Sequence, residues 1–122
     1  MQPLARSPAA AYARVDLDAR IEASTSADLT RICLEAAVAA LGQALIALER
    51  APGVPPVEAL ARARGIALYL ARAVDPQNPM RGALVTFYGG LAETLGRNLR
   101  EPRIADIVQV RGDFEDLLSA LG

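Results

Sequence analysis

The chain has 122 residues, enough for one domain that buries roughly two-thirds of the surface exposed by the unfolded chain. Hydrophobic residues make up 52% of it and aromatic residues only 4%, so the core must consist of Ala, Leu, Val and Ile. With no His and one Cys, the usual zinc ligand sets and His-activated nucleophiles are excluded, and we expect no cofactor and no enzymatic activity. A formal net charge of −1 predicts no nucleic-acid partner.

The sequence favours a cytoplasmic location. The first dozen residues lack the apolar run of a secretory signal, and Cys33 has no second cysteine with which to form an internal disulfide. The longest apolar stretch, residues 36–48, is about 13 residues long, whereas crossing a bilayer needs roughly 20. We therefore expect this stretch to be a buried helix and expect no membrane partner.

Residues 1–24 are expected to form an extended N-terminal arm. Apolar and charged residues alternate from Val15 to Glu22, a pattern typical of a half-buried strand. No later segment offers a strand to pair with it. We therefore expect the arm to lie along a helical body and to be partly mobile when alone.

A first helix is expected from Thr25, where Thr25 and Asp28 resemble a capping box. Residues 51–56 end this helix, because Gly53 tolerates a positive φ and the prolines cannot continue the hydrogen-bond ladder. Its apolar face is wide enough to imply contact on two sides. The central stripe of that face is Leu34, Val38, Leu41, Leu45 and Leu48.

Three further helices follow, over residues 57–74, from Pro79 to about Leu99 with Asn78 as N-cap, and after the break at Glu101 and Pro102. Short loops make neighbouring helices antiparallel, so the predicted fold is all-α, an antiparallel up-down four-helix bundle over residues 25–122. Tyr88 is expected on the shoulder of the third stripe. The three stripes are Leu60, Ala63, Ala67, Leu70 and Val74; Met80, Leu84, Phe87, Leu91 and Leu95; and Ile107, Val110, Phe114, Leu117 and Leu121.

Glycine is unusually frequent inside these expected helices, where each Gly costs about 1 kcal/mol relative to Ala. Two explanations are open. The missing side chains permit helices to cross closely inside the bundle, or Gly89, Gly90 and Gly96 smooth an outer groove that receives an apolar helix from a partner. The seven positions are Gly42, Gly65, Gly82, Gly89, Gly90, Gly96 and Gly112.

Several short motifs occur along the chain in the order that is typical of one known protein family. They are Ala11-Tyr12 followed by Val15 and Leu17, Thr25-Ser26-Ala27-Asp28-Leu29, Leu34-Glu35-Ala36-Ala37, Val74-Asp75, and Leu84 with Phe87-Tyr88 followed by Leu91 and Leu95. In this order, nearly end to end, the chain resembles the flagellar secretion chaperone family usually called FliS. The third-helix segment is the most specific part of the resemblance.

The resemblance implies a chaperone that binds the C-terminal helical segment of flagellin, blocks its premature polymerisation and delivers it to the flagellar type III export gate. In such an arm, Tyr12 plugs a groove until flagellin displaces it, contacts the export machinery, or has a plain packing role. Val15 belongs to the same motif. A disordered segment that folds onto a bundle needs an extended apolar groove rather than a pocket.

Partner contact is accordingly expected at two groups of residues. Leu84, Tyr88, Gly90 and Leu91 would line a groove, although a stripe of this kind is also typical of core. The remaining candidates are Leu34, Leu41 and Tyr69. Residues Leu34 and Leu41 are also core candidates, and for Tyr69 both a surface position available for contact and a packed position are open. The alternative function is a helical adaptor or regulator that homodimerises through broad apolar faces, whereas a free export chaperone is expected to be monomeric.

Overall fold

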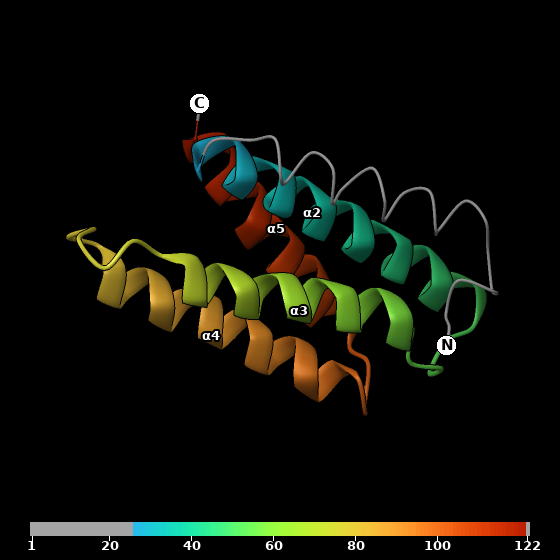
Figure 1. The fold of residues 1–122 in the computed structure, drawn as a ribbon. Helices are drawn as coiled ribbons and strands as arrows, with labels where there is room; N and C mark the ends of the chain where they lie inside the picture. The colour runs from blue at the N-terminus through green and yellow to red at the C-terminus, as the bar shows by residue number, and fades with distance from the viewer. Residues whose placement is uncertain (1–25, 122) are drawn as a thin grey trace, which may run out of the picture. The chain divides into compact units, whose positions relative to one another are not determined.

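The structure is a computed structural model in which residues 26–121 are described. Over that range the chain is all-α and contains no strand, which confirms the predicted fold class and the number of helices (Figure 1). The expected arm over residues 1–24 and the Thr25 cap lie outside the described residues. The helices are α2 (Ser26–Arg50), α3 (Val57–Ala73), α4 (Arg81–Asn98) and α5 (Ile104–Ala120).

The chain divides into two compact units, residues 1–32 and 33–122, with the boundary inside α2. Within the second unit, α4 packs against both α3 and α5. Figure 1 shows α3 and α4 side by side along their lengths. A side chain of α5 also reaches α2, because Arg111 Nε donates a hydrogen bond to the carbonyl oxygen of Val38 at 3.3 Å.

The turn after α2 depends on a single glycine. Gly53 has a φ of +83°, and no other described residue has a positive φ. Two backbone hydrogen bonds hold this turn. The Ala51 amide donates to the Ala47 carbonyl, and the Val54 amide donates to the Ala51 carbonyl. A side chain at this φ would be strained, so the predicted role of Gly53 in ending the helix is confirmed.

The segment before α4 consists of two side-chain-capped turns. Asp75 Oδ1 accepts the Gln77 amide at 2.8 Å, and Asn78 Oδ1 accepts the Met80 amide at 2.8 Å. Asn78 thus satisfies a backbone amide two residues ahead, as an N-cap does, although α4 itself begins only at Arg81. The predicted start at Pro79 was therefore two residues too early.

The buried faces of α3 and α5 agree with the predicted stripes over most of their lengths. Val74 of the α3 stripe is only half-buried and lies just past the helix end. At the end of α5, Leu117 is half-buried and Leu121 is exposed, so the core contact of this helix stops at Phe114. The buried residues are Leu60, Ala63, Ala67 and Leu70 on α3, and Ile107, Val110 and Phe114 on α5.

The buried face of α4 differs from the predicted stripe. Tyr88 is 5% exposed and belongs to the core, whereas Phe87 is 39% exposed and Met80, which precedes the helix, is 58% exposed. One residue turns a helix by about 100°, so choosing Phe87 over Tyr88 rotated the predicted face. The actual face contains a small residue and an amide, which a search for large apolar side chains passes over. It consists of Tyr88, Leu91, Ala92, Leu95 and Asn98.

By length and composition alone, the segment Ala27–Arg50 of α2 is long and apolar enough to cross a membrane, and its most apolar 18-residue window has a mean hydropathy of 1.7. This differs from the expectation based on residues 36–48, because the complete helix adds apolar residues on both sides of that stretch. Of the most apolar window, 44% is buried inside the structure, and both core helices and signal sequences near an N-terminus pass the same test.

Candidate functional site

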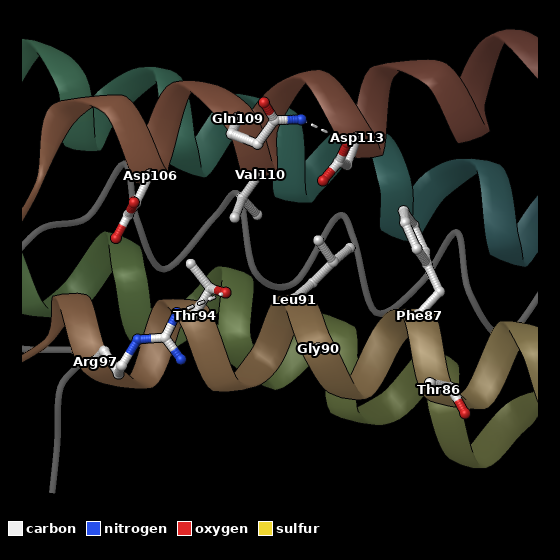
Figure 2. A pocket seen from close by; sticks show the side chains of 10 residues that line it. All are labelled: Thr86, Phe87, Gly90, Leu91, Thr94, Arg97, Asp106, Gln109, Val110 and Asp113. Carbon is white, nitrogen blue, oxygen red and sulfur yellow. Dashed lines mark hydrogen bonds between the residues drawn. The ribbon is translucent and has the colours of Figure 1, made fainter.

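An open groove of about 450 Å³ runs between α4 and α5 (Figure 2). Both walls come from the second unit of the chain, residues 33–122. The residues that line it are Thr86, Phe87, Gly90, Leu91, Thr94 and Arg97 from α4, and Asp106, Gln109, Val110 and Asp113 from α5.

The floor of the groove is apolar. Leu91 and Val110 lie at its base, 5% and 2% exposed, and extend toward each other from the two helices in Figure 2. Phe87 lies at one end of the groove with 39% of its surface exposed. Its ring packs edge-on against the ring of Tyr88, with a centroid distance of 6.3 Å. Beside this ring the wall is low, because Gly90 has no side chain. The groove therefore combines a buried aliphatic base with an accessible aromatic edge.

The α5 wall is polar and acidic. Asp106, Gln109 and Asp113 occupy positions i, i+3 and i+7, which place them on one face of the helix. Gln109 Nε2 donates to Asp113 Oδ1 at 3.1 Å, so this carboxylate receives a neutral donor. Neither carboxylate forms an ion pair with any residue of the described chain. Among the described residues, the charge of the wall is therefore not neutralised by a direct ion pair.

A buried amide fixes the corner where the two walls meet. Asn98, fully buried at the end of α4, donates from Nδ2 to the Thr94 carbonyl at 2.9 Å and to Asp106 Oδ2 at 3.1 Å. Its Oδ1 accepts the Arg103 amide at 2.6 Å. All the hydrogen-bonding groups at this buried position are thus paired, which is the usual condition for a polar side chain in a core. The network sets where α5 begins relative to the groove.

Arg97 supplies the basic group of the groove, near the α4–α5 corner. Its guanidinium lies 3.8 Å from Glu93 one turn earlier and donates to Thr94 Oγ1 at 3.3 Å. Both members of the ion pair are more than half exposed, so the pair contributes little to stability. Arg97 is turned toward its own helix rather than bound to the α5 wall.

The helix glycines do not mediate close approach of helix backbones in the described chain. At Gly42 and Gly96 an added Cβ would meet only the ends of Arg111 and Arg64, at 3.5 and 3.4 Å. At the other five helical positions no described atom lies within 4 Å of the added Cβ. Of the two explanations, internal crossing therefore finds no support here, and Gly90 is the one of the three proposed groove glycines that lines the groove.

The structure brings together only part of the residues expected to contact a partner. Gly90 and Leu91 line the groove, whereas Tyr88 is buried behind it. Leu34 and Leu41 are 1% and 0% exposed and belong to the core rather than to an accessible surface. Tyr69 and Leu84 are half-buried and do not line the groove, and Tyr12 and Val15 lie outside the described residues.

Cys33 and Tyr88 are buried titratable groups of the core. Burial raises the pKa of the Cys33 thiol above its ordinary value of 9.0. Burial also raises the pKa of Tyr88 above its ordinary value of 10.0, with a smaller increase from the charge of a nearby Cys33 thiolate. A buried thiol with a raised pKa is a packing group rather than a reactive thiolate.

The α5 wall was missed from the sequence. Its acidic and amide side chains flank the buried stripe of Ile107, Val110 and Phe114 by one position, where polar residues are ordinarily read as a solvated face. The usable signal was the repeat of Asp106, Gln109 and Asp113 along one edge of the helix. It becomes informative only once α4 is known to present Phe87 and Gly90 opposite.

An open groove with an apolar floor and a polar α5 wall is suited to receiving an amphipathic helix. Among the described residues no group of three or more Cys, Asp or Glu is placed to hold a metal ion.

In comparisons with protein-family models, with curated proteins and with solved structures, nothing matches the chain.

Proposed function

We propose that this protein is an export chaperone that binds the C-terminal helical segment of flagellin in the groove between α4 and α5. Binding covers the apolar face of that segment, blocks its premature polymerisation in the cytoplasm and presents it to the flagellar type III export apparatus. The protein acts by binding, and no reaction step is assigned to it.

The groove is the observation that supports this proposal most directly. Its base of Leu91 and Val110 and its aromatic edge of Phe87 offer apolar anchors spaced along two helices. Gly90 lowers the α4 wall where the backbone of an incoming helix would pass, and nothing described within 4 Å requires a glycine there. Since a helical Gly costs about 1 kcal/mol relative to Ala, an external use for this one is favoured.

The identity of the partner comes from the family resemblance of the sequence. The segment Leu84 to Tyr88, its most specific part, lies on α4 and includes Phe87 of the groove. We extend the proposal to the arrangement of the helices, which would form an antiparallel up-down bundle preceded by an N-terminal arm. In that arrangement Tyr12 and Val15 belong to the arm and would act in partner exchange or export.

The test uses the full chain and a synthetic peptide of the C-terminal segment of the flagellin encoded in the same genome. Calorimetry is expected to give a one-to-one complex at micromolar concentration, with an increase in helicity by circular dichroism. Gly90→Leu should abolish binding while the chain stays folded. Gly82→Leu is the matched control, because Gly82 is an equally open position on α4 that does not line the groove.

Absence of binding by the wild-type chain would overturn the flagellin assignment. Light scattering of the free protein distinguishes the alternative function. A stable dimer would favour the homodimerising adaptor, for which Ile104 and Val108, exposed one turn apart on α5, offer an apolar patch. The export chaperone predicts a monomer that becomes a one-to-one complex.

A further inference from the structure

We infer that the groove selects a partner helix carrying an Arg or Lys side chain placed between Asp113 and the ring of Phe87. The inference rests on the proposed function in one respect, that a helix enters the groove. It adds the chemical class of the residue that the groove recognises, a cation on the edge of the partner's apolar face.

The first support is the meeting of a carboxylate and an aromatic ring at one end of the groove. In Figure 2, Asp113 on α5 and Phe87 on α4 lie at the same end and extend into the space between the helices. Asp113 is half-buried and Phe87 is 39% exposed, so both are accessible from the groove. A cation that fits between them gains an ion pair and a cation–π contact from one side chain.

The second support is that the described residues around Asp113 do not neutralise its charge. Its hydrogen-bond donor is the neutral amide of Gln109, and no described cation forms an ion pair with it. On the α4 side, the lining residues at this end are uncharged. Arg97 lies at the opposite end, near Asp106 in Figure 2, where it is occupied by Glu93 and Thr94. An acidic partner residue would therefore meet repulsion at the Phe87 end, and a basic one would meet attraction.

The third support is the direction of the other nearby basic side chain of α5. Arg111 points away from the groove to α2, where its Nε bonds the Val38 carbonyl at 3.3 Å and its guanidinium lies 3.5 Å from the Cβ position of Gly42. It does not neutralise the acidic wall. The complementary charge is thus left for a partner to supply.

The experiment uses two synthetic amphipathic peptides of about 20 residues with the same Leu stripe, one with Arg and one with Glu along the same edge of that stripe. Binding to the 15N-labelled full chain is followed by NMR titration at low and high salt. The Arg peptide should bind at least about threefold more tightly than the Glu peptide, with shifts at the Phe87, Gly90 and Asp113 amides.

Variants of the protein then test the assigned residues. Asp113→Asn and Phe87→Leu should each bring the affinities for the Arg and Glu peptides closer together, and Asp113→Asn should also reduce the salt dependence of Arg-peptide binding. Asp116→Asn is the matched control, since Asp116 is an exposed residue of α5 that does not line the groove. It should leave the preference unchanged.

The outcomes separate this inference from the flagellin assignment. Equal binding of the two peptides, an unchanged preference in Asp113→Asn, or no binding of either peptide would each overturn the inference. If the Arg peptide is preferred through Asp113 while the flagellin segment fails to bind, the cation site stands and the flagellin assignment fails. If the flagellin segment binds and Asp113→Asn leaves its affinity intact, the proposed function stands and the cation site fails.

Discussion

Asn98 and Asp106 join the last turn of α4 to the first turn of α5 through a hydrogen bond of 3.1 Å from Nδ2 to Oδ2. The same amide group bonds the Thr94 carbonyl, and its oxygen bonds the Arg103 amide. One buried side chain therefore closes the α4–α5 corner and fixes the polar end of the groove.

Replacement of Asn98 by Ala should be strongly destabilising. The change leaves the Arg103 amide and the Thr94 carbonyl without these partners, and it should lower the free energy of unfolding by about 2–3 kcal/mol. Urea unfolding measures this loss. Gln109→Ala, at an exposed position of the groove wall, should change stability by less than about 0.5 kcal/mol. Similar small effects for both variants would contradict a structural role for the Asn98 network.

The same substitution at two glycines should have opposite effects. Gly90→Ala should stabilise the free protein by about 0.5–1 kcal/mol, because the added Cβ meets no described atom and Ala has the higher helix propensity. Gly53→Ala should destabilise by about 1 kcal/mol or more, because Gly53 holds a φ of +83°. Thermal and urea unfolding of both variants check the pair. A loss of stability in Gly90→Ala would show that this position is packed internally.

Neighbouring aromatic residues on α4 should differ in their contribution to stability. Tyr88→Ala should cost about 3–5 kcal/mol, since the side chain is 5% exposed and its removal leaves a cavity. Phe87→Ala should cost roughly 1 kcal/mol, because Phe87 is 39% exposed and loses mainly its edge contact with Tyr88. Comparing the urea midpoints of the two variants decides between the observed face of α4 and the one predicted from sequence.

The buried face of α3 could be predicted from the sequence, whereas the buried face of α4 could not. The class, the helix number and the α3 stripe follow from periodicity, because Leu60, Ala63, Ala67 and Leu70 repeat at spacings of three and four. On α4, Phe87 and Tyr88 are adjacent aromatics, and periodicity alone does not decide which faces inward. The deciding contribution comes from Ala92 and Asn98, which are buried because of their position and hydrogen bonds rather than their hydrophobicity.

The groove could be predicted only in part for a related reason. Gly90 and Leu91 were identified on α4, because a glycine inside a helix is destabilising and therefore indicates a special role at that position. The opposite wall depends on which face of α5 lies next to α4, which is a property of the packed chain. The position of Asp106 and Asp113 in the groove wall could therefore be identified only from the structure.

Stability should decrease at alkaline pH through Cys33 and Tyr88. Burial raises the pKa of both groups in the folded state, so the unfolded chain ionises them first, at their ordinary values of 9.0 and 10.0. Their contribution is fully present below pH 9.0 and is lost as pH rises through the unfolded and then the folded pKa values. Urea unfolding between about pH 7 and 11 should show this decline, and Cys33→Ala should reduce its first part. A flat profile in the wild-type chain would refute the assignment.

Gly89 and Gly90 are consecutive on α4, and Gly90 lines the groove together with Phe87. Two adjacent residues without side chains give this stretch of the helix the lowest intrinsic resistance to bending, since kinks concentrate at such positions. The α4 wall would therefore bend most easily at this point, and under the proposed function partner helices of somewhat different diameter would be accommodated by slight bending of α4 rather than by repacking of the core.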